Sequence, residues 1–106
     1  MAKYLVKGNY VGEGIAGLLA EGGTSRGAAA AAAVASVGGT MEDLYFAFGD
    51  TDVYAICDLP DAASAAAVSL LINSSGHVQI SLTPLLSAED LDAASKKSPT
   101  YRAPGT

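Results

Sequence analysis

Apolar residues recur at every second position in four segments of the chain, and at helical spacing between those segments. The last segment shows the alternation best, because Val78, Ile80 and Leu82 are separated by polar residues throughout. A two-residue period places successive side chains on opposite faces of an extended strand. The pattern therefore predicts four strands, over residues 4–10, 41–48, 53–58 and 77–83.

Helices are predicted in the segments that separate and follow these strands. They cover residues 11–20, residues from Thr24 or Ser25 to 37, residues 62–74 and residues 88–97. Thr24 or Ser25 is the expected N-cap of the second helix and Asp61 that of the third, while Ser87 and Asp90 have the spacing of a capping box. The first helix should be short, because each of its three glycines weakens a helix by about 1 kcal/mol relative to alanine.

The second helix contains an unbroken run of alanines over residues 28–33. Alanine is the strongest helix former, and Val34 and Val37 continue an apolar face, so the run favours a helix over a low-complexity segment. Gly38 and Gly39 should end it. The small side chains should let this helix lie close against a sheet.

The order of the predicted elements is strand, helix, strand, strand, helix, strand and a final small helix. A break at residues 49–52 makes the middle two strands a hairpin. This order predicts an α+β fold of the ferredoxin-like βαββαβ type, with a four-stranded antiparallel sheet and helices on one face. The final strand should lie beside the first, with the third on the first strand's other side. Residues 1–97 should form one domain, and residues 98–106 a C-terminal tail.

The hairpin break and the residues after it resemble the signature of the GYD-domain family. Gly49 and Asp52 are followed by alternating apolar residues and then by Pro60 and Asp61. The family's usual Gly-Tyr-Asp is replaced here by Gly-Asp-Thr-Asp, so the loop is one residue longer. The resemblance covers residues 4–95. It implies that two such sheets pack face to face as a dimeric α/β barrel.

The composition indicates a thin core and a partner subunit. Half of the 106 residues are hydrophobic, but many of these are alanines, and the chain has two Phe and no Trp. Alanine buries little surface, so part of the buried surface should come from further copies of the chain, in a homodimer or a higher homo-oligomer.

Charge and chain pattern argue against several classes of protein. The formal net charge of -5 argues against nucleic acid and anionic membranes as partners, because phosphates require basic patches. The N-terminal residues have no apolar signal region, and no apolar run approaches the length of a membrane span. The single cysteine excludes an intrachain disulfide and fits a reducing compartment. We expect a soluble cytoplasmic protein.

The same alternation assigns side chains to the two faces of the sheet. Leu44, Phe46 and Phe48 should point toward the helices. The opposite face should carry the candidate ligand-binding residues Lys7, Asn9, Tyr45, Tyr54, His77 and Gln79. This face can be open to solvent, form a partly polar dimer interface, or line a cavity between two sheets. His77 and Tyr54 should lie about 10 Å apart, with Lys7 or Asn9 between them.

Two charged or titratable residues are candidates for a specific role. His77 is the only histidine and has the pKa range for acid–base chemistry near neutrality, although polar residues are also common where a strand begins. Arg26 matches a position that is often basic in GYD-domain proteins. It can bind a small-molecule anion near the end of the first strand with the help of helix amides, or form an ordinary salt bridge with Glu21 or Glu42.

Neither a metal ion nor a cofactor is expected. The acidic residues around the hairpin lack the spacing of a calcium loop and should serve turns and caps; they are Asp50, Asp52, Asp58 and Asp61. Cys57 should be a buried core residue. Gly12-x-Gly14-x-x-Gly17 matches a dinucleotide fingerprint in its letters, but the acidic ribose ligand and the parallel βαβ context are missing.

No catalytic motif stands out, and three functions stay open. The first is a small-molecule-binding module. The second is a cofactor-free enzyme, such as an isomerase, oxygenase or cyclase, acting on a small apolar substrate. The third is a structural subunit of a larger oligomer. An enclosed cavity that includes His77 would favour the first two, and a filled, dry interface would favour the third.

Overall fold

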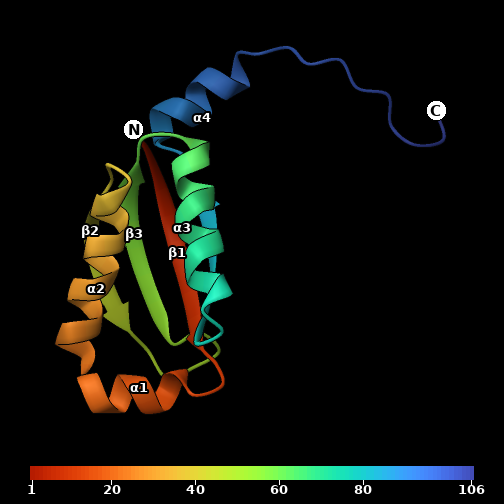
Figure 1. Ribbon diagram of the computed structural model, residues 1–106. Coiled ribbons are helices and arrows are strands. Elements are labelled where there is room, and N and C mark those ends of the chain that lie inside the picture. Colours follow the sequence, from red (N-terminus) through yellow and green to blue (C-terminus); the bar gives the residue numbers. More distant parts are fainter.

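A computed structural model describes residues 1–106 (Figure 1). The elements follow in the order β1 (Ala2–Tyr10), α1 (Gly14–Glu21), α2 (Gly23–Ser36), β2 (Thr40–Phe46), β3 (Val53–Leu59), α3 (Ala62–Ser74), β4 (Val78–Pro84) and α4 (Ala88–Ser95). The strands form one antiparallel sheet in the order β2-β3-β1-β4. The predicted α+β ferredoxin-like fold and its strand order are confirmed.

The helices lie on one side of the sheet (Figure 1). α2 packs along β2, and α3 packs along β4 and β3. α1 crosses the end of the sheet where β1 ends, while α4 and the residues after it extend away from the other end. The second face of the sheet has no helix over it within this chain.

Two of the three predicted N-caps are confirmed, those of α3 and α4. Asp61 accepts a hydrogen bond from the amide of Ser64 at 2.7 Å, and Ser87 forms a capping box with Asp90, as predicted. The prediction of Thr24 or Ser25 as the cap of α2 is wrong. α1 ends only two residues before α2 begins, and Gly22, with a φ of 87°, makes the turn between them in the left-handed region that favours glycine.

The hairpin differs from the prediction at its tip. β2 ends at Phe46, because the amide of Ala47 donates to the carbonyl of Asp52 at 2.7 Å and closes the loop there. Phe48 therefore lies in the loop and is fully exposed, which corrects its expected position against the helices. Leu44 packs against the core on the helix side, as predicted.

The core is small and lies between the sheet and the two long helices. Only nine residues are buried, among them Cys57 and Leu59 of β3 and Val34 of α2. Burial raises the pKa of the Cys57 thiol, so this side chain is a protonated core group at neutral pH. The predicted core position of Cys57 is confirmed.

Candidate functional site

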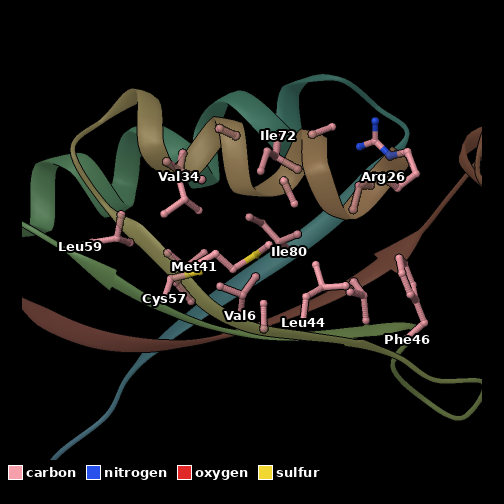
Figure 2. A pocket seen from close by; sticks show the side chains of 18 of the residues that line it. Val6, Arg26, Val34, Met41, Leu44, Phe46, Cys57, Leu59, Ile72 and Ile80 are labelled. Atoms are coloured by element: carbon pink, nitrogen blue, oxygen red, sulfur yellow. The ribbon is translucent and has the colours of Figure 1, made fainter. Parts of the chain in front are cut away.

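An apolar cavity of about 130 Å³ separates the helix layer from the sheet (Figure 2). Of the 19 residues that line it, 18 are hydrophobic. Its floor includes Val6 and Ile80 of the sheet, and its roof includes Ala30 of α2 with Val68 and Ile72 of α3. The cavity thus lies on the covered face of the sheet, opposite the face on which the sequence pattern placed the candidate ligand-binding residues.

Small residues on the inner face of α2 border this space. Near the start of the helix, a Cβ on Gly23 would be 3.1 Å from the ring of Phe46. α2 thus lies against the Phe46 side chain near its start, while its middle presents short alanine side chains to the cavity. The small side chains let α2 lie close against β2, as predicted, and they also leave the cavity open beside the middle of the helix.

Arg26 is the one lining residue that is not hydrophobic. Figure 2 shows it at the end of the cavity opposite Leu59. One of its guanidinium nitrogens lies 3.7 Å from Oε2 of Glu21, which is an ion pair without a hydrogen bond. The predicted pairing with Glu21 is confirmed, whereas Glu42 instead contacts the Lys3 ammonium.

A more polar hollow adjoins the cavity at this end. It lies beside α1 and is lined by Glu13, Glu21, Ser75 and His77 among others. Tyr10 and Arg26 line both spaces, as do Ile72 and Val78. The apolar cavity thus ends at an arginine and a tyrosine, beyond which carboxylates and a histidine face a solvent-accessible hollow.

His77 lies at this α1 end and is exposed. Its carbonyl accepts a hydrogen bond from the amide of Val11 at 2.9 Å, one step beyond the pairing of Tyr10 with Val78. A Cβ on Gly14 would be only 2.0 Å from that carbonyl oxygen, so the first turn of α1 touches the chain at His77.

The uncovered face of the sheet brings the other predicted side chains into one row. Tyr45 pairs with Tyr54, Tyr54 with Lys7, and Lys7 with Ser81. β1 lies between the strand of Tyr54 and β4, as predicted, but the expected distance of about 10 Å between His77 and Tyr54 is wrong. His77 comes four residues before Ser81, just outside the start of β4, which adds about 13 Å along the strand direction at the usual rise.

Asn9 has a structural role at the end of β1. Its side-chain oxygen accepts a hydrogen bond from the amide of Asp52 at 3.0 Å, and the Asp52 carboxylate accepts one from the amide of Tyr10 at 3.0 Å. These reciprocal bonds fasten the hairpin to β1. Gln79 pairs with Asn9 on the neighbouring strand, so neither residue lies near the cavity.

The described side chains offer little for metal or acid–base chemistry. No three His, Cys, Asp or Glu side chains lie together in a way that could hold a metal ion. The cavity wall itself contains only three titratable groups, Tyr10, Arg26 and Cys57. None of the helices combines the length and the apolar character needed to cross a membrane.

Comparison with known families adds to this geometry. The profile of the GYD domain matches residues 4–94. The chain belongs to the GYD-domain family. Within this GYD domain the match covers every residue that lines the cavity, and it stops within α4. No curated protein and no solved structure matches the chain.

The sequence pattern predicts neither the cavity nor the position of Tyr10 in its wall. The available signal was the helical spacing of Ala29, Ala30 and Ala33, which places three methyl-sized side chains on the inner face of α2. Such a face can either approach a sheet or leave a space. Which of the two occurs depends on the residues that set the distance between helix and sheet, such as Phe46, which lies against Gly23 at the start of α2.

Proposed function

We propose that this GYD-domain protein is a small-molecule-binding module that works as a homodimer, with a ligand held between the sheet and the helices of each subunit. The cavity carries the proposal: about 130 Å³ of space with an almost wholly apolar lining and a single charged residue at one end. Native interiors contain few voids larger than a water molecule, because unfilled space costs packing energy.

The size of the space limits its occupant. Engineered cavities of about 150 Å³ with aliphatic and aromatic walls stay dry and bind benzene, whereas sites for drug-sized ligands measure about 300–1,000 Å³. A space of about 130 Å³ fits one small ring or a short branched chain. A larger ligand has to extend past Arg26 into the hollow beside α1.

The wall chemistry supports binding over catalysis. The Cys57 thiol has a raised pKa and is a poor nucleophile. The exposed His77 imidazole makes no side-chain hydrogen bond that would orient it as a general base. The apolar walls supply burial, and Arg26 and Tyr10 supply polar contacts at one end.

The uncovered sheet face supports the homodimer. Leu5 and Ile56 lie on this face with no helix over them, and Tyr45 keeps 70% of its surface exposed. A second copy placed face to face would cover these side chains, and stable interfaces of this kind bury about 1,600 Å² in total. The partner subunit would also pack against the far side of the sheet that forms the floor of each cavity.

Filling the cavity tests the binding proposal. Ala30→Leu places three more carbons in the space, and Ala32→Leu makes the same change at an exposed position of α2 that does not line it. Titration with toluene, followed by the methyl NMR signals of Val34 and Ile80, should show saturable binding to the wild type and to Ala32→Leu. Ala30→Leu should abolish it. Equal binding to all three, or no binding to the wild type, would contradict the proposal.

A further inference from the structure

We infer that the cavity selects small apolar carboxylates, with the apolar part inside and the carboxylate held by Arg26. This rests on the proposed function and names the ligand class. Three observations carry it: where Arg26 lies, what its guanidinium contacts, and which charged groups stand further out.

The position of Arg26 makes it the first charge that a buried ligand meets. It lines both the apolar cavity and the hollow beside α1, whereas Glu13 and Glu21 line the hollow alone. Figure 2 places it at one end of the space, beyond the apolar side chains of α2 and α3. A ligand that fills the cavity with a ring therefore presents its polar end to Arg26.

The guanidinium of Arg26 has N–H donors that no protein group accepts from. It makes no hydrogen bond to another protein group, and its nearest carboxylate oxygen, on Glu21, is 3.7 Å away. About a third of the side chain is exposed. The fork of an arginine matches a carboxylate in a bidentate arrangement, which is the strongest pairing available to it. A ligand carboxylate can form these bonds where Glu21 does not.

Glu21 is then a competitor of the ligand. Its own side chain is about half exposed, so it can turn into solvent when a second carboxylate arrives. Arg26 paired with Glu21 is neutral as a unit, which weakens its attraction for an anion. Removing the charge of Glu21 should therefore strengthen the binding of a carboxylate and leave the binding of an uncharged ring unchanged.

Three probes of nearly equal size test the inference: benzoate, toluene and benzylamine. Calorimetric titration of the full-length protein should give benzoate the highest affinity, and added salt should weaken benzoate alone. Arg26→Gln should weaken benzoate by about tenfold, because a hydrogen bond to a charged group is lost at a partly exposed site, and should leave toluene unchanged. Glu21→Gln should strengthen benzoate several-fold. Arg102→Gln, which removes an arginine from the tail, is the matched control.

The possible outcomes separate this inference from the proposed function. Toluene binding that Ala30→Leu abolishes, with no preference for benzoate, would overturn the carboxylate inference and leave the cavity proposal standing. A preference for benzylamine that Glu21→Gln removes would overturn it in favour of cationic ligands. Failure of all three probes to bind would overturn both. Unfolding curves of Arg26→Gln and Glu21→Gln check that each variant is folded, so that lost affinity reports the site.

Discussion

The two faces of the sheet deal with their apolar side chains in different ways. On the covered face, α2 and α3 bury Cys57 and Leu59 almost completely and still leave a cavity between them. On the other face, Leu5 and Ile56 stay partly exposed beside two tyrosines. The helices thus cover one face of the sheet but leave a cavity there. The other face carries apolar side chains that no element of this chain covers. In a protein this rich in alanine, the cavity lies on the face that helices cover, where the helix side chains are short.

The largest effect should come from truncating the covered face. Leu59→Ala removes a side chain that is only 1% exposed, which should lower the free energy of unfolding by about 2–5 kcal/mol. Leu5→Ala is the matched change on the uncovered face and should cost less. Because a second copy is proposed to cover Leu5, its cost should grow with protein concentration. Urea unfolding at two protein concentrations measures the loss of stability in both variants. Equal losses that do not change with protein concentration would contradict the difference between the two faces.

The second effect concerns the dimer. Ile56→Asp places a charge in the middle of the uncovered face, and each unpaired polar group buried by the partner should weaken association by about 2 kcal/mol or more. A two-fold interface would count this cost twice. Sedimentation equilibrium should show a dimer for the wild type and a monomer for the variant. A folded wild-type monomer at micromolar concentration would rule out the dimer.

A smaller effect, of opposite sign, should come from the cavity. Ala30→Leu should raise the free energy of unfolding by about 1 kcal/mol, because the added carbons are buried in existing space and lose some rotamer freedom. Ala32→Leu should stay within about 0.5 kcal/mol of the wild type, as is usual for exposed positions. Thermal unfolding compares the two variants. Destabilisation by Ala30→Leu alone would mean that the middle of α2 is already close-packed.

The smallest effect should appear only in acid. The hydrogen bond from the Ser64 amide lowers the pKa of Asp61 below its unfolded value of about 3.9. The stability that this cap provides is therefore full above the unfolded pKa and is lost as the pH falls through the folded pKa. Asp61→Asn keeps an N-cap that does not titrate, so its stability should change less with acid. Unfolding curves from neutral to acidic pH test this; identical slopes would mean that Asp61 does not contribute.

The fold could be predicted from the sequence because alternation is a local signal. Val78, Ile80 and Leu82 identify the covered side of β4, and the order of elements then leaves few topologies. The N-caps at Asp61 and Ser87 could also be predicted, because each depends on residues three positions apart in the sequence. The cap of α2 was not, since a glycine between two adjoining helices replaced the expected side chain.

The site was harder to predict because it depends on the distance between the helices and the sheet and on the register of the strands. A sequence pattern gives the face on which a residue lies, but it does not give the distance between a helix and a sheet. Near the start of α2 this distance is set by Phe46, which lies against Gly23 and is remote in sequence from the alanines. The expected distance between His77 and Tyr54 was wrong for a similar reason: the register of β4 against β1 places Ser81, and not His77, level with Tyr54.

The C-terminal arm alters the hydrodynamic behaviour of the molecule. Because α4 and the residues after it extend away from the sheet, the radius of gyration is 16.8 Å, whereas a compact chain of this length would have about 13 Å (Figure 1). A single subunit of this shape would elute from a sizing column early, as a heavier globule does. The number of subunits therefore has to be determined from the molecular mass, by sedimentation equilibrium or native mass spectrometry. Trimming the arm after Ser95 should shrink the Stokes radius far more than the molecular weight.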